Sequence, residues 1–166
     1  MIGRLGVVAL MLAVPAAVIT PVAAEVPDTI AAKGQVVVVQ FHAEGAQIYQ
    51  CESGSGGLTW QFREPIAALF DDGRTVGRHY AGPSWESGGS IIVGKATGRA
   101  PGASSSDIPW LRLEVSERRG DGPLKDVTTI QRINTKGGSF EGRCEKRGEL
   151  HAQPYAADYV FLRKAP

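Results

Sequence analysis

Short apolar and β-branched runs, separated by glycine-rich turns, recur along the chain after its first two dozen residues. Segment 35–41, QVVVVQF, is rich in valine, and segment 111–115 places Leu111, Leu113 and Val115 on one face of an alternating pattern. Alternation with a period of two is typical of half-buried β-strands. Helical periodicity of useful length is absent from the sequence after these first residues. The pattern therefore predicts an all-β protein.

Turn signals set the expected strand boundaries. Glu44-Gly45 predicts a hairpin turn between two early strands, Pro65 is expected to end a strand, and Asp71-Asp72-Gly73 is a strong hairpin signal. Ser87-Gly88-Gly89 predicts a further turn. The expected strands cover residues 35–41, 46–51, 59–63, 67–70, 75–80, 90–98, 108–117, 127–133 and 155–162.

About nine short strands at regular spacing predict one antiparallel domain. The sequential hairpins favour an up-and-down barrel, and a sandwich remains the alternative. In the strand at 127–133, Ile130 and Arg132 share one face with Thr128, so which face turns to the core stays open.

The N-terminus predicts export. Arg4 precedes an apolar run at 5–19, and Val22-Ala23-Ala24 supplies small residues before Glu25. These features predict a signal peptide at 1–24, cleaved to leave an all-β domain at 25–166 without a membrane span, in the periplasm or outside the cell. An uncleaved N-terminal anchor is the alternative.

Charge argues against a polyanionic partner. The 18 Lys and Arg residues nearly balance the 17 Asp and Glu residues, and loss of Arg4 with the signal leaves the expected mature chain close to neutral. Binding of nucleic acid or anionic membrane through bulk electrostatics is therefore not expected. His42 and His151 have no partner at metal-ligand spacing, and no phosphate loop occurs, so no metal or cofactor is predicted.

Cys51 and Cys144 are the two cysteines of the chain. An even pair in an exported protein is most simply one structural disulfide, which would join an early strand to a late segment.

Residues 76–90, VGRHYAGPSWESGGS, hold the densest cluster of polar, aromatic and glycine residues. His79 and Glu86 are the candidate catalytic residues, as a general base and its carboxylate partner, with Trp85 as an apolar wall. The structural alternative is that the glycines and Pro83 shape a sharp corner, Trp85 packs in the core and His79 bonds to backbone.

Several segments together resemble a secreted family of unknown function from bacteria and fungi. They include GAQIYQC at 45–51, VGRHYAGPSWE at 76–86, IPWL at 108–111, IQR with NTKGG at 130–138, and YAADYVF at 155–161. The resemblance covers nearly all of the expected mature chain but implies no activity. Some fungal members carry a malate dehydrogenase label. This sequence does not support that label, because it has no strand-GxGxxG-helix unit for binding a dinucleotide. Gly88-Gly89-Ser90 and Ser139-Phe140-Glu141 depart from the family's usual residues.

The sequence supports one hypothesis of function and two alternatives. The hypothesis is an exported β domain, not an enzyme, that binds a small ligand or a cell-envelope partner. Its candidate ligand-binding residues are Trp85, Tyr80, Arg78 and Trp60. The alternatives are a hydrolytic or lytic enzyme that uses His79 and Glu86, and a purely structural envelope protein.

Overall fold

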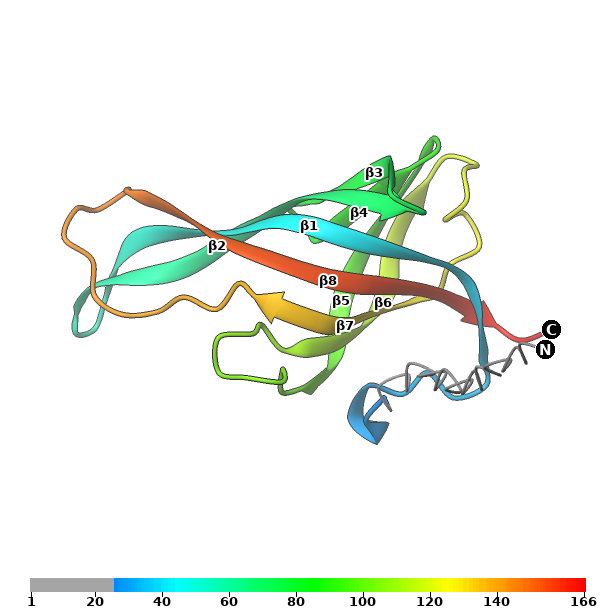
Figure 1. The fold of residues 1–166 in the computed structure, drawn as a ribbon, viewed down its shortest axis with the longest axis horizontal. Coiled ribbons are helices and arrows are strands. Elements are labelled where there is room, and N and C mark those ends of the chain that lie inside the picture. Colours follow the sequence, from blue (N-terminus) through cyan, green and yellow to red (C-terminus); the bar gives the residue numbers. More distant parts are fainter. Residues whose placement is uncertain (1–25) are drawn as a thin grey trace, which may run out of the picture.

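A computed structural model describes residues 26–166, so the predicted signal peptide lies outside the described residues. A short 3-10 helix, η1 (Asp28–Ile30), precedes eight strands (Figure 1). The strands are β1 (Gln35–Gly54), β2 (Gly57–Asp71), β3 (Arg74–Tyr80), β4 (Ser84–Ser87), β5 (Ser90–Ala100), β6 (Trp110–Arg119), β7 (Thr129–Gly137) and β8 (Leu150–Lys164). Within 26–166, no helix is long and apolar enough to cross a membrane.

The eight strands form one closed up-and-down barrel. Each strand pairs antiparallel with the next, and β1 also pairs with β8, so that Gln35 lies opposite Lys164 and Gln50 opposite Leu150. The all-β prediction is confirmed, and closure of the sheet decides for the barrel over the sandwich. The turns predicted around Gly73 and Gly88 are also present.

Two predicted breaks are wrong, so four expected strands merge into β1 and β2. The short β4 was not among the expected strands, and the total is therefore eight instead of about nine. Gly45 lies inside the continuous β1 opposite Ala67, where a Cβ would collide with the Ile66 carbonyl oxygen. The glycine there allows close approach of two strands and makes no turn. Pro65 lies inside β2 opposite Gln47, just beyond a bulge in the β1–β2 ladder, and does not end the strand.

One end of the barrel is filled with apolar side chains. Trp85 and Phe161 pack edge to face in this core, and Gly94 leaves room for the indole because a Cβ there would lie 3.0 Å from Trp85 Cζ3. Leu124 and Val127, from the connection between β6 and β7, are fully buried in the same core. The filled end fixes the positions of the strands around the rest of the interior.

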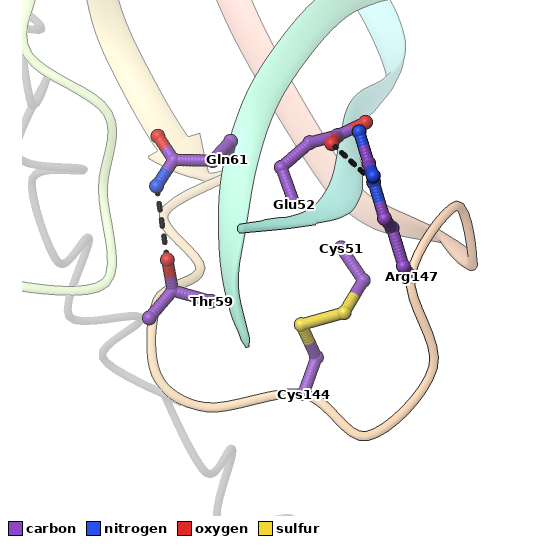
Figure 2. The surroundings of a disulfide bond; sticks show 6 residues. All are labelled: Cys51, Glu52, Thr59, Gln61, Cys144 and Arg147. Carbon is purple, nitrogen blue, oxygen red and sulfur yellow. Dashed lines mark hydrogen bonds and ion pairs between the residues drawn. A yellow bond between two sulfur atoms is a disulfide. The ribbon is translucent and has the colours of Figure 1, made fainter. Parts of the chain in front are cut away.

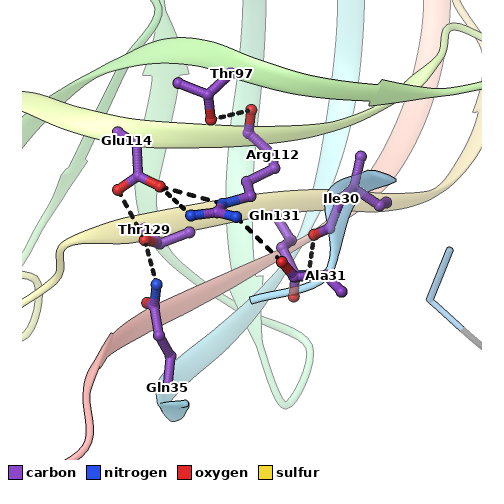
Figure 3. Close-up of polar contacts among 8 residues, drawn as sticks. All are labelled: Ile30, Ala31, Gln35, Thr97, Arg112, Glu114, Thr129 and Gln131. Carbon is purple, nitrogen blue, oxygen red and sulfur yellow. Dashed lines mark hydrogen bonds and ion pairs between the residues drawn. The ribbon is translucent and has the colours of Figure 1, made fainter. Parts of the chain in front are cut away.

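The segment before β1 crosses the outer face of β6 and β7 (Figure 3). Gln131 Nε2 donates to the Ile30 carbonyl at 2.7 Å, and Arg112 Nη1 donates to the Ala31 carbonyl at 3.2 Å. Arg112 is also paired with Glu114. The segment before β1 buries the outward-facing Gln131, so both faces of β7 are shielded. Ile130 and Arg132 lie on the other face of β7, which points to the interior.

Three strands extend past the barrel wall: the end of β1, the start of β2 and the start of β8 (Figure 1). The predicted disulfide is present here, joining Cys51 of β1 to Cys144 of the β7–β8 connection with the Cα atoms 5.9 Å apart (Figure 2). The bridge ties that connection to the extension, beside an ion pair between Arg147 and Glu52.

Candidate functional site

The end of the barrel opposite the filled core holds a cavity of about 540 Å³. Small-molecule sites in proteins commonly occupy roughly 300–1,000 Å³. Exposed residues line its open side, and the buried His79 and Gln47 line its inner end. The lining residues are Gln47, Tyr49, Phe62, Arg63, Pro65, His79, Gly82, Pro83, Ala96, Arg99, Ile108, Pro109, Leu111, Leu113 and Arg132.

The charged side chains of the cavity are all positive. Arg63, Arg99 and Arg132 line it, and the lining residues that the structure describes include no Asp or Glu. Arg63 is paired with Glu64 at 3.1 Å. Arg99 and Arg132 take part in no ion pair with another described residue. The cavity therefore has an excess of positive charge.

Arg132 is the innermost of these cations. It lies on β7 between Leu111 of β6 and the buried Tyr159 of β8, so its side chain points into the barrel. Its Nε and Nη2 atoms donate to the Pro109 carbonyl at 3.1 and 2.8 Å. This carbonyl fixes one edge of the guanidinium but does not neutralise its charge.

His79 lies at the inner end of the cavity, 2% exposed. Its ring stacks on Trp85 with centroids 4.4 Å apart, and its Nδ1 lies 2.8 Å from the Ser84 carbonyl oxygen. Burial lowers the pKa of His79 to about 3, and the nearby Arg132 charge acts in the same direction. The imidazole is therefore neutral at physiological pH.

Tyr159 lies beside this histidine, and Tyr155 lies beside Tyr159. Tyr159 contacts His79 with ring centroids 4.9 Å apart, and its hydroxyl lies 3.4 Å from that of Tyr155. Burial raises the pKa of both phenols, so both stay protonated. These two phenols thus supply no negative charge to compensate Arg132.

A row of aromatic rings runs from the cavity along the three-stranded extension. Tyr49 contacts Phe62 and Phe140, each with centroids 5.8 Å apart, and Phe140 stacks on His151 at 3.8 Å. Tyr49 also donates to the Gly138 carbonyl at 2.7 Å. Trp60 completes the row beside Phe140.

The structure does not bring His79 and Glu86 together. The hairpin register pairs His79 with Trp85 and Arg78 with Glu86, and adjacent pairs face opposite sides of a sheet. His79 therefore faces the interior, whereas the Glu86 carboxylate accepts a 2.8 Å hydrogen bond from Arg78 on the outer surface. The Arg78 guanidinium also lies 5.0 Å from the Tyr80 ring centroid.

The four candidate ligand-binding residues lie in three places. Arg78 and Tyr80 belong to the outer cluster with Glu86, Trp85 lies in the core beneath His79, and Trp60 belongs to the aromatic row. None of them lines the cavity itself.

Sequence reasoning missed Arg132, Arg99 and Gln47 as cavity residues. The one available signal was the placement of Arg132 on the same face of its strand as Ile130, an apolar residue of the core. Within 26–166, His, Cys, Asp and Glu side chains form no group of three or more that could hold a metal ion.

The fold and cavity define a class: an eight-stranded up-and-down β-barrel with one filled and one hollow end, of a size that can hold one small ligand. The chain belongs to a family described as a protein of unknown function (DUF3455), whose model matches residues 31–163. This confirms the family resemblance seen in the sequence. Neither the curated proteins nor the solved structures include a match to the chain.

Proposed function

We propose that this protein is an exported binding protein that holds a small apolar ligand with an acidic group, such as a medium-chain or aromatic carboxylate, in the barrel cavity. The disulfide supports export, because such bonds persist mainly in oxidising compartments. The expected signal peptide points to the same location.

The observation that carries the proposal is the Arg132 guanidinium, which faces the cavity without an acidic partner among the described residues. A cation taken partly out of water is costly unless an anion compensates it. A ligand carboxylate would supply that anion and could accept from the guanidinium donors that the Pro109 carbonyl leaves free.

The rest of the lining favours an apolar ligand body. Leu111, Leu113 and Ile108 contribute aliphatic surface, and Tyr49 and Phe62 contribute aromatic surface near the open side. Burial of such a body contributes roughly 25 cal/mol per Å² of apolar surface removed from water. Affinity would come from the apolar body, and Arg132 would select the charge.

Binding is favoured over catalysis by the state of His79. A general base works best with a pKa near the working pH, whereas the pKa of His79 is lowered to about 3. Its carboxylate partner in the enzyme hypothesis, Glu86, is bound to Arg78 on the outer surface.

Calorimetric titration of the mature protein with decanoate and 2-naphthoate tests the proposal, with decanol as the uncharged comparison. We expect both acids to bind and Arg132→Gln to weaken them about tenfold to a hundredfold, since a hydrogen bond to a charged group contributes roughly 1.5–3 kcal/mol. Decanol should be affected little.

Arg118→Gln is the matched control. Arg118 likewise donates to two backbone carbonyl oxygens, those of Lys125 and Val127, but does not line the cavity. Binding of the acids should survive this change. Failure of both decanoate and 2-naphthoate to bind, or equal losses in the two variants, would reject the proposed function.

A further inference from the structure

We infer that the preferred ligand is a hydroxylated carboxylic acid, whose hydroxyl group donates a hydrogen bond to Nε2 of His79 at the inner end of the cavity. This inference rests on the proposed function, because it adds a second polar contact to the acid bound by Arg132. It names the class of ligand more narrowly than the charge of the cavity does.

The hydrogen-bond partner of Nδ1 fixes the tautomer of His79. The Ser84 carbonyl oxygen, 2.8 Å away, can only accept, so Nδ1 must carry the proton. Because a neutral imidazole has one ring proton, Nε2 is then a bare acceptor.

This acceptor has no protein donor among the described residues. Of the two ring nitrogens, Nδ1 alone has a hydrogen-bond partner among these residues. Nε2 has none, and protein atoms do not enclose it completely. His79 is 2% exposed, yet its side chain lines the cavity. The cavity is therefore the side from which a donor can reach Nε2.

The surroundings hold this acceptor in place and keep it neutral. Trp85 stacks on one face of the ring, Tyr159 packs against it, and Ser84 anchors its other nitrogen. The charged group nearby is Arg132, which opposes protonation of the imidazole. A site built with a fixed polar group discriminates strongly against ligands that leave that group unpaired.

The two polar anchors differ in what they recognise. Arg132 supplies donors and a positive charge for a carboxylate, whereas Nε2 supplies an acceptor that a carboxylate cannot use. A hydroxyl group satisfies Nε2, and a methyl ether of the same shape does not, because an ether has no proton to donate. This difference gives a test that leaves the protein unchanged.

The experiment compares 2-naphthoate, a set of its hydroxy isomers and the corresponding methoxy isomers by calorimetry on the mature protein. We expect at least one hydroxy isomer to bind tenfold or more tightly than both its methoxy counterpart and 2-naphthoate. In His79→Phe, which keeps a flat ring against Trp85, the hydroxy and unsubstituted acids should bind alike.

Nitrogen-15 NMR of histidine-labelled wild-type protein gives a second readout that does not depend on a variant. The free protein should show His79 protonated at Nδ1, and the Nε2 signal should shift when the hydroxy acid binds but not when 2-naphthoate binds. A proton on Nε2 in the free protein would overturn the inference.

The outcomes separate the two proposals. If the acids bind with no preference for any hydroxy isomer, the hydroxyl inference is wrong and the proposed function stands. If no carboxylate binds at all, the proposed function fails and the inference fails with it.

Discussion

Acid should destabilise this barrel mainly through one buried side chain, His79. Burial lowers its pKa from 6.5 to about 3 in the folded state, whereas the unfolded chain regains the ordinary value. Between these two values the unfolded state binds one proton more than the folded state. The free energy of unfolding therefore falls as the pH falls below about 6.5, and the slope approaches about 1.4 kcal/mol per pH unit.

Between pH 7 and pH 5 this difference amounts to about 2 kcal/mol for the single histidine. The side chain is 2% exposed, so solvent screening does not reduce the effect. The pKa of the Asp107 carboxyl is lowered from 3.8 by hydrogen bonds from the Gly137 amide and from Ser104, so the stability that it contributes is lost only at more acidic pH.

Urea unfolding at pH 7, 6 and 5 measures the loss in the free energy of unfolding. The wild type and His42→Gln should both lose stability as the pH falls, because His42 lies on the exposed outer surface. The free energy of unfolding of His79→Gln should change little with pH. If His79→Gln does not fold, proton NMR of the wild type decides. A His79 ring signal that titrates near pH 6.5 in the folded protein would refute the argument.

Two further changes test the packing of the barrel and its cross-link. Gly94→Ala should lower the free energy of unfolding by about 1–3 kcal/mol, because the new methyl group would meet the enclosed Trp85 ring at 3.0 Å and Leu113 at 3.3 Å. Gly56→Ala, with no atom within 4 Å of the new Cβ, should change it by less than about 0.5 kcal/mol, and equal effects in urea unfolding would contradict this view of the core. Replacing Cys51 and Cys144 together by Ser opens a loop with a sequence separation of 93, so it should cost up to about 4–5 kcal/mol and lower Tm in calorimetry by about 8 °C or more. An unchanged Tm would show that the bridge does not stabilise the fold.

The alternation of residues along the chain was enough to predict the β class, whereas the turn signals predicted several turns and the sequential hairpins predicted the barrel. The Asp-Gly step at residues 72–73 is a local signal, and it was interpreted correctly. Gly45 was not, because a glycine gives the same local signal in a turn as in a strand that another strand approaches closely. Only the position of Ala67 across the ladder separates the two cases, and that position depends on pairing between distant segments.

The candidate site was harder to predict for a related reason. Whether His79 and Glu86 share a face depends on the register of the β3–β4 hairpin, and a shift by one residue exchanges the faces. Arg132 could not be recognised as a cavity residue from its own strand, because the other lining residues come from strands that only closure of the barrel brings around it. Which face of β7 points to the core was also hard to predict. The segment before β1 covers the outer face of β7 and buries Gln131, a polar side chain that would otherwise be exposed.

Pairing of β1 with β8 also bears on when the fold can form. The ladder that closes the barrel joins the first of the eight strands to the last, with Gln35 opposite Lys164, so its two halves are synthesised at well-separated times. Until β8 has left the ribosome, β1 has only one of its two neighbours and the interior stays open to water. Contacts of such long sequence separation also form slowly. We therefore expect the nascent chain to fold later than one with local contacts would. An unfolded chain is the form in which a polypeptide can be threaded through a narrow channel.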